Sequence, residues 1–379
     1  MKSGLQRKVL IAWLITSLLG WPLTTFAQKK ENRQSIFRDT LDNAFDISRW
    51  LIQKEGFLPV PGVITEPAVG FGGAAALLFF HSSYLKKKGP PNISGVAGGG
   101  TQNGTWGVGA FHAGFYKNDR IRYTGALFKL DVNLKFYGPG LIFKEGIGLN
   151  LDSWLFYQQL KFRIGESNFF IGGQYLLLNT DNTFEKVIDL PQFTGVTLHA
   201  NLSELTAVFN YESRDNVFTP THGIFARFTA TYSDDWLGGE GLYGRLNGSI
   251  IGFIPLSDKL NLGLRWESIH ALGDVPFWAR PIVQMRGVPA MKYQNNNVSL
   301  VETEINYNLY KRWYVLVFGG LGNTYQDFDN FSEGSSVATI GTGFRYQVAR
   351  LFGLKMGADV AWSTEDFAFY IIVGHAWLR

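Results

Sequence analysis

The chain has 379 residues, of which 46% are hydrophobic and 15% are aromatic, with 44 glycines and no cysteine. The lack of cysteine excludes a disulfide framework, a thiolate metal site and a cysteine nucleophile. The net charge of +4 arises mostly in residues 1–27, and without them 32 basic residues face 31 acidic ones, so the charge gives no support for nucleic-acid binding.

Residues 1–27 have the pattern of a signal peptide. Lys2, Arg7 and Lys8 precede the apolar run 9–19, and small residues surround Phe26 at the end of the segment. We expect cleavage before Gln28. The alternative, an uncleaved membrane anchor, needs about 18 apolar residues, and this run is shorter.

Residues 28–56 form a short segment of their own. One helical stripe is shared by five apolar residues, which predicts a short amphipathic helix: Phe37, Leu41, Ala44, Phe45 and Leu51. The segment is too short for a separate domain of the usual size. It either docks on the domain that follows, binds a partner, or acts only as a linker.

Residues 57–379 carry a strand pattern. Residues 128–136 (FKLDVNLKF) alternate apolar and polar at every position, and 260–267 do so with one glycine on the polar side. A soluble sandwich would alternate too. However, runs of eight or nine residues exceed the ~5–6 residues of typical strands, and aromatic pairs such as Phe136-Tyr137 stand near the strand ends. The pattern favours an all-β, antiparallel transmembrane barrel, with 28–56 on its periplasmic side.

We predict sixteen strands, because single-chain bacterial barrels have even strand counts. Two lie between residues 57 and 81, with a break near 65–69, and Asn103-Gly104 marks a tight hairpin. The others are predicted at 93–101, 105–116, 122–137, 154–164, 169–178, 196–211, 224–232, 242–254, 259–272, 300–310, 312–325, 335–349, 353–363 and 366–378.

Glu302 and Glu304 share the lumen face of one predicted strand, just after a long loop that contains Arg286. Two carboxylates this close repel unless a cation lies between them. If the loop folds into the lumen, Arg286 can bind a carboxylate through a two-point fork. Alternatively, both glutamates are hydrated by lumen water and Arg286 lies on an external loop.

Several motifs, in this order, resemble the barrel of the BamA/TamA superfamily (bacterial surface antigen type). Residues 214–220 with Gly223 resemble that family's turn before a long central strand, and 273–277 resemble the start of its large loop. The rest are the loop residues Met285, Arg286, Gly287 and Tyr293, the acidic Glu304, and the terminal signal with Gly374 and Trp377. The resemblance covers 205–379 well and 57–200 in general pattern only.

The resemblance implies a sixteen-stranded barrel in the outer membrane of a Gram-negative bacterium, with a long loop folded into the lumen. Arg286 would bind inward acidic residues, Glu304 being the best match. The terminal strand, ending near Trp377, would pair loosely with the first strand and form a lateral seam that client strands or polypeptides engage.

Two departures from the family pattern concern function. Family members usually carry periplasmic POTRA modules before the barrel, and residues 28–56 leave no room for them. Gly320 stands where the family pattern favours an aspartate, so half of the acidic receptor for Arg286 would be missing, and Glu302 is the expected substitute.

Two functions are therefore open. The first is insertion of membrane proteins or translocation of polypeptides through the seam, with client barrel proteins, outer-membrane lipid and periplasmic or lipoprotein partners. The second is a passive pore for small solutes. We expect no enzyme, cofactor or metal site, since no phosphate, zinc or calcium motif is present and Ser153, Ser268 and His270 give no strong catalytic spacing.

Overall fold

The computed structural model describes residues 36–53, 58–66, 68–81, 92–141, 143, 145–184, 197–364 and 366–377. The predicted signal peptide and cleavage site lie outside these residues. Residues 36–377 belong to one compact unit, which is the subject of everything below.

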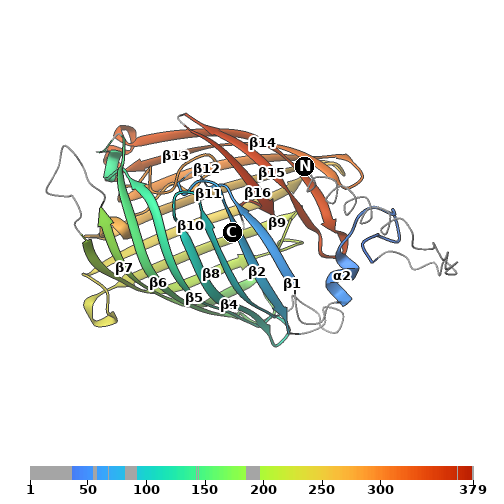
Figure 1. Ribbon diagram of the computed structural model, residues 1–379, viewed down its shortest axis with the longest axis horizontal. Coiled ribbons are helices and arrows are strands. Elements are labelled where there is room, and N and C mark those ends of the chain that lie inside the picture. Colours follow the sequence, from blue (N-terminus) through green and yellow to red (C-terminus); the bar gives the residue numbers. More distant parts are fainter. Residues whose placement is uncertain are drawn as a thin grey trace, which may run out of the picture. The chain divides into compact units, whose positions relative to one another are not determined.

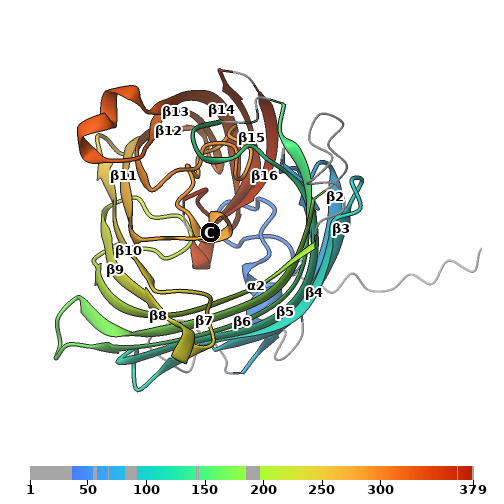
Figure 2. The same cartoon turned by 90° about the vertical axis from the view of Figure 1, so that its left-hand side faces the viewer.

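Sixteen antiparallel strands form a single sheet in which each strand pairs with its neighbours in sequence order (Figure 1). The sheet curls round into a nearly closed barrel, seen from one end in Figure 2. The predicted fold class and the predicted number of sixteen strands are confirmed, and two of these strands lie before residue 81 as expected. The strands are β1 (Leu58–Ile64), β2 (Gly72–Phe80), β3 (Ile93–Thr101), β4 (Trp106–Tyr116), β5 (Ile121–Phe136), β6 (Ile147–Arg163), β7 (Phe169–Phe184), β8 (Thr197–Glu212), β9 (Gly223–Ser233), β10 (Tyr243–Pro255), β11 (Leu260–Gly273), β12 (Asn297–Tyr310), β13 (Trp313–Tyr325), β14 (Ser335–Ala349), β15 (Leu354–Ser363) and β16 (Phe367–Val373).

Helices are few and short. The described residues contain α2 (Ser48–Gln53) and five 3-10 turns, which are η1 (Pro139–Leu141), η3 (Asp235–Leu237), η4 (Phe277–Ala279), η5 (Phe328–Glu333) and η6 (Arg350–Phe352). In the described part of the chain, no helix is long and apolar enough to cross a membrane. We call the end of the barrel where β11 leads into β12 the loop end, and the opposite end, with the β12–β13 and β14–β15 connections, the turn end.

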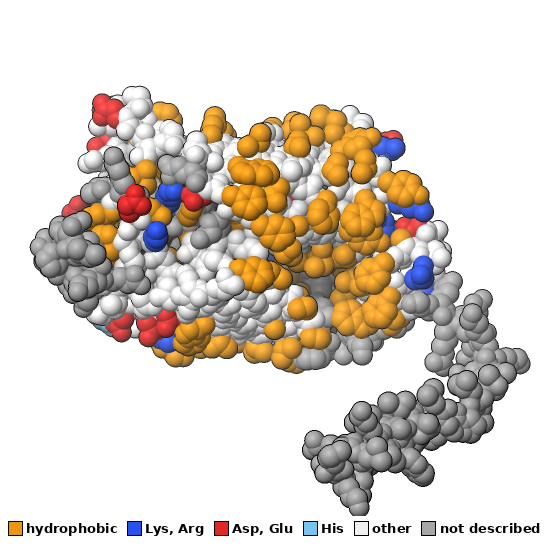
Figure 3. All heavy atoms as spheres, turned by 45° about the horizontal axis from the view of Figure 1, so that its top comes forward, with side chains coloured by type: hydrophobic (Ala, Val, Ile, Leu, Met, Phe, Trp, Pro, Cys, Tyr) orange, Lys and Arg blue, Asp and Glu red, His pale blue; other side chains and the backbone are white. Residues whose placement is uncertain are grey.

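The alternation of residues separates the two faces of the sheet. On β12, Val301 and Ile305 are 48% and 41% exposed, whereas the side chains of Glu302 and Glu304 between them are buried. Side chains of successive strand residues point to opposite faces, so the apolar set lies outside and the charged set inside. Figure 3 shows exposed hydrophobic side chains gathered over the wall of the barrel.

Three strands differ from the predicted ranges by more than three residues at one end. β6 begins seven residues before the predicted start at 154, and β7 continues to Phe184 rather than 178. On β6 the added residues alternate in the opposite sense, with Leu149 buried on the inner face and Asn150 and Asp152 on the outer face. On β7 residues 179–183 are all polar, so neither extension carries the outward apolar residues on which the prediction relied. β16 ends at Val373 because Gly374 takes a φ of 82° and turns the chain.

The segment before β1 is bound to the turn end. Instead of a helix through residues 37–51, it forms turns and an isolated bridge between Arg38 and Phe45, with only α2 helical. Asn43 has a φ of 56°, which no helix interior accepts. The guanidinium of Arg312, at the β12–β13 turn, explains this path, because it binds three carboxylates at 2.6–2.7 Å: Asp39, Asp42 and Asp46.

Candidate functional site

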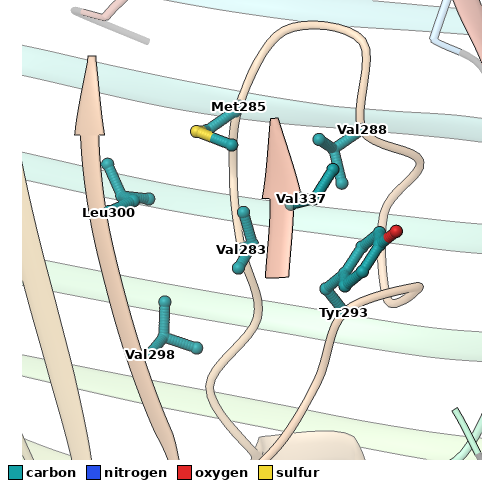
Figure 4. Packing of buried hydrophobic residues seen from close by; sticks show 7 residues of the cluster. All are labelled: Val283, Met285, Val288, Tyr293, Val298, Leu300 and Val337. Atoms are coloured by element: carbon teal, nitrogen blue, oxygen red, sulfur yellow. The ribbon is translucent and has the colours of Figure 1, made fainter. Parts of the chain in front are cut away.

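The candidate site lies on the loop of residues 274–296, which joins β11 to β12. The loop is held as a narrow turn by a bridge between Ile282 and Gln294 and by the Val283 N–H, which donates to the Tyr293 carbonyl at 2.9 Å. Its apolar side chains are buried against the inner face of β12 and β14 (Figure 4). The buried cluster consists of Val283, Met285, Val288, Tyr293, Val298, Leu300 and Val337. Burial of seven apolar residues holds the loop against the wall.

Arg286, at the tip of this loop, binds two strands at once. Its Nη2 donates to Glu304 Oε2 on β12 and its Nη1 to Asp359 Oδ2 on β15, both at 2.8 Å. The guanidinium carbon lies 3.4 Å from the ring centroid of Phe318 on β13, a cation–π contact. All these side chains are buried. We call Arg286, Glu304, Phe318 and Asp359 the Arg286 site.

Small residues on β14 make room for this site. A Cβ added at Gly341 would lie 2.2 Å from Phe318 Cζ, and one at Gly343 would lie 2.0 Å from Asp359 Oδ1. No side chain fits at those distances, so the two glycines let Phe318 and Asp359 occupy the space over β14 between their own strands. The guanidinium can therefore span from β12 to β15.

The structure brings Glu304 to Arg286 but takes Glu302 elsewhere. Glu302 lies directly opposite Arg265 on β11 and accepts a hydrogen bond from it. The second carboxylate of the Arg286 site is Asp359, which the sequence reasoning missed; its signal would have been an acidic residue on the inward face of 353–363. The expectation that Glu302 would replace the missing aspartate as a partner of Arg286 was therefore wrong, because Glu302 binds Arg265 and Asp359 takes that place.

Gly320 has a packing role at the position where an acidic residue was expected. A Cβ there would lie 2.7 Å from Glu302 Cγ and 3.1 Å from Met285 Sδ. At Gly322, a Cβ would lie 2.7 Å from Val283 Cγ1. The two glycines of β13 therefore form the surface on which the loop residues Val283 and Met285 pack.

Gly287 brings the loop backbone against β15 and β16. It has a φ of 90°, and a Cβ there would lie 3.2 Å from Ala361 Cβ. Its N–H donates to the Tyr370 hydroxyl on β16 at 2.9 Å. Farther along the loop, Lys292 Nζ lies 2.7 Å from Asp366 Oδ2. The loop thus reaches the last strand of the sheet.

The residues after β16 also join the site. Gly374 turns the chain inward, and His375 Nε2 lies 3.3 Å from Glu304 Oε1. The His375 ring contacts Phe253 on β10 and Trp377, with centroids 4.9 and 4.8 Å apart. The terminal signal with Gly374 and Trp377 therefore does not extend the last strand as predicted; it covers the Arg286 site from inside.

A second polar cluster lies on the outer face near the loop end. Ser268 Oγ lies 2.9 Å from His270 Nε2, and His270 Nδ1 lies 3.0 Å from Asn297 Oδ1. However, Ser268 Oγ also donates to the Val298 carbonyl at 3.2 Å, and Asn297 Nδ2 donates to the Gln326 carbonyl at 2.6 Å. These bonds attach the β13–β14 connection to the barrel wall, which is sufficient to account for the cluster.

The two ends of the sheet approach each other without pairing. β1 and β16 lie close together, but among the described residues they share no ladder, and each pairs only with its other neighbour. We call this gap the seam. Unpaired strand edges are open to pairing with another chain.

Comparison with known proteins agrees with this architecture. Residues 158–279 match the family described as the Omp85 superfamily domain. This confirms the family resemblance seen in the sequence. No curated protein matches the sequence.

Solved structures similar to this barrel support the same fold. BamA from Haemophilus ducreyi lacking POTRA domains 1–3 matches with a TM-score of 0.58 at 13% identity, over 85% of this chain and 70% of that one. CdiB from Escherichia coli matches with a TM-score of 0.58 at 13% identity, over 86% and 61%. CdiB from Acinetobacter baumannii matches with a TM-score of 0.54 at 11% identity, over 84% and 59%. The chain spans less than two thirds of the two CdiB chains.

Proposed function

We propose that the protein resides in the outer membrane of a Gram-negative bacterium and inserts or translocates polypeptides at its seam. The observation that carries this proposal is the sixteen-stranded sheet in which, among the described residues, β1 and β16 are not paired with each other. A closed barrel has no free edge, whereas this one keeps two edges within the membrane wall. A client strand that pairs with an edge satisfies its own backbone groups before it leaves water.

In this proposal the Arg286 site gives the seam one rigid side. Arg286 ties β12 to β15, and Gly287 binds Tyr370 of β16, so the loop braces the C-terminal strands from inside. The first strands have no such brace among the described residues. Opening would then occur by movement of β1 and β2 away from β16, with the C-terminal strands staying in place.

The test is an insertion assay in lipid vesicles. The purified full-length protein is reconstituted in phosphatidylcholine vesicles, and a urea-unfolded eight-stranded outer-membrane barrel is added. Folding of this client is followed by its heat-modifiable gel mobility. We expect the client to fold several-fold faster than in empty vesicles, and a disulfide between Val63→Cys and Phe367→Cys across the seam to abolish the gain.

A matched disulfide separates seam closure from general stiffening. Val132 and Leu151 lie opposite each other on β5 and β6, so Val132→Cys with Leu151→Cys joins two strands that are already paired. This variant should retain the activity. Equal client folding with and without the seam disulfide would contradict the proposed function.

A passive pore is the second candidate, and one observation favours it. A cavity of about 620 Å³ remains beside the loop, lined by charged inward side chains that include Arg227, Arg245 and Glu204. The loop narrows this space, since its residues Ile282 and Gln284 line the same cavity. Stable single-channel conductance in planar bilayers, combined with no effect on client folding, would establish the pore instead.

A further inference from the structure

The two edges of the seam differ in their hydrogen-bonding groups, and the difference begins with the prolines of β1. β1 pairs with β2 without interruption from Leu58 to Ile64. In an antiparallel ladder, alternate residues of a strand direct both backbone groups to one neighbour, and the residues between direct theirs to the other. The sets can be assigned, because His81 N–H donates to the Asn92 carbonyl across β2 and β3 at 3.0 Å.

This bond assigns odd-numbered residues of β2 to β3 and even-numbered ones to β1. The β1 partners of the even set are Leu58, Val60, Gly62 and Ile64. Pro59, Pro61 and Val63 therefore direct their backbone groups to the seam. Proline has no N–H, so this edge offers three carbonyls but only the Val63 donor.

The seam edge of β16 is complete. Gly374 N–H donates to the Lys355 carbonyl and Ser363 N–H to the Asp366 carbonyl, both at 2.8 Å, which assigns the even-numbered residues to β15. The seam-facing residues are Phe367, Phe369, Ile371 and Val373. None is proline, so each offers both an N–H and a carbonyl.

We propose that β16, and not β1, is the strand that pairs with a client strand. This inference rests on the proposed function and names the edge on which it operates. A strand that pairs antiparallel with β16 exchanges two hydrogen bonds at each seam-facing residue. A strand that pairs with β1 loses one of the two bonds at Pro59 and one at Pro61.

The same deficit keeps the seam open. If β1 closed on β16, its prolines would leave two β16 carbonyls without a backbone N–H donor, so closure would lack two of the hydrogen bonds that a strand without proline would form. A client strand without proline competes for β16 on better terms than β1 does. A client strand can therefore take the place of β1 beside β16.

The side chains of β16 define the client as a transmembrane strand. Outward residues such as Phe367 and Val373 are 56% and 54% exposed, while the inward Ala368, Tyr370 and Ile372 are buried. A strand added beside β16 needs the same period, with apolar residues at every second position facing lipid. Strands of outer-membrane barrels have this pattern.

Disulfide capture tests the choice of edge, since the chain has no native cysteine. The full-length protein carries either Ile371→Cys on β16 or Val63→Cys on β1, two seam-facing residues with exposed side chains. It is reconstituted in phosphatidylcholine vesicles and mixed with a ten-residue peptide of the β11 sequence 260–269 in which Leu264 is replaced by cysteine. A scrambled peptide without alternation is the control.

We expect capture of the alternating peptide at residue 371 to exceed capture at residue 63 by about ten-fold, which corresponds to the two missing bonds at a modest net energy each. The Pro59→Ala/Pro61→Ala protein should bring capture at 63 up and capture at 371 down, because β1 then competes for the peptide and for β16. Pro255→Ala, at the end of β10 away from the seam, should change neither. Heat-modifiable mobility verifies that each variant is folded.

The other outcomes are distinct. Capture at residue 63 equal to or above that at 371 overturns the assignment to β16 and leaves the proposed function standing. Capture at neither edge contradicts the proposed function itself, and the assignment with it. Rapid disulfide dimers of the Ile371→Cys protein without peptide would make a second copy of the chain the partner of β16, and overturn the proposal for a client.

Discussion

Arg286 and Asp359 are 73 residues apart in the chain, yet the arginine Nη1 lies 2.8 Å from the aspartate Oδ2 inside the barrel. Asp359 also accepts a hydrogen bond at 2.8 Å from Arg345 Nη2 on β14. The site therefore sets two guanidinium groups against the carboxylates of Glu304 and Asp359. Because the two guanidinium groups and the two carboxylates balance in charge and bond directly, they hold the loop in one position against the strands.

Replacing Arg286 with alanine should destabilise the folded barrel. The change removes the guanidinium that binds the buried Glu304 and Asp359, and breaking a buried ion pair by removing one partner costs about 3–5 kcal/mol. We expect the heat-resistant gel mobility to disappear at a lower temperature and protease to cut within 283–293. Arg286→Lys should rescue only part, because an ammonium cannot form both bonds in the same planar geometry.

An exposed arginine provides the control for that series. Arg120 pairs with Glu166, and their side chains are 59% and 81% exposed. Surface pairs of this kind contribute little. Arg120→Ala should leave the heat-resistant mobility unchanged. An equal loss of heat resistance in Arg120→Ala and Arg286→Ala would show that the Arg286 site contributes no more to stability than a surface ion pair.

Adding a methyl group at Gly320 should displace the loop. The new Cβ of Gly320→Ala would meet Glu302 Cγ at 2.7 Å and the Val301 carbonyl oxygen at 2.9 Å. We expect faster proteolysis of the loop and lower thermal stability. Gly252→Ala on β10 is the matched variant, since nothing lies within 4 Å of its added Cβ. Identical protease patterns for the two proteins would show that Gly320 is not needed for loop packing.

The attachment of residues 36–53 should depend on pH. Hydrogen bonds from Arg350 and Arg312 lower the pKa of Asp39 below its usual 3.8, and the bond from Arg312 lowers that of Asp42. A lowered pKa in the folded state means that the attachment is complete above pH 3.8 and weakens as the pH falls through the lowered value. The protection of the 36–53 amides against hydrogen exchange, taken relative to the intrinsic exchange rate at each pH, should be high at pH 5 and 7 and should fall below pH 3.8.

Arg312→Gln makes the same attachment testable at neutral pH. Without the guanidinium, three nearby carboxylates repel one another, and the segment should exchange fast at pH 7. Lys311→Gln, at the neighbouring position of the same turn, should leave exchange slow. Slow exchange in both proteins would mean that contacts other than the arginine hold the segment.

The cluster of Ser268, His270 and Asn297 should prove structural. A fluorophosphonate probe is expected to leave Ser268 unlabelled, because the hydroxyl also bonds to the Val298 carbonyl and is buried. Asn297→Ala removes the bond to the Gln326 carbonyl, so protease should cut the β13–β14 connection faster. Stoichiometric labelling of Ser268 would instead reveal a reactive serine on the outer wall.

Alternation and turn signals predicted fourteen strands, and the rule that single-chain bacterial barrels have even strand counts supplied the two between residues 57 and 81. Alternation failed where β6 and β7 extend with polar residues on the outer face, because the prediction relied on apolar residues there. The pairing of Arg286 with an inward glutamate was one of two interpretations of the residues, and the family resemblance indicated Glu304 as the partner. Asp359 was missed because its approach depends on how β12 and β15, which are not neighbours, lie across the barrel.

The partner of Glu302 could have been predicted from the register of two adjacent strands. Its cation, Arg265, stands directly opposite on β11, so the register of two adjacent strands alone would have paired them. The inward turn at Gly374 had a weaker signal, since a glycine followed by aromatic residues reads equally well as the end of a strand. Proline at 59 and 61 was visible in the sequence, but its meaning required knowing which neighbour each residue faces.

The placement of Asp359, Tyr370 and His375 has a consequence for assembly. All three come from residues 354–377, which are synthesised after the loop that they bind. Until they arrive, Arg286 has only Glu304 as a carboxylate partner, and Gly287 has no hydroxyl to receive its N–H. The loop can therefore reach its final position only after β15 and β16 are in place, so a correctly packed loop indicates that all sixteen strands have assembled.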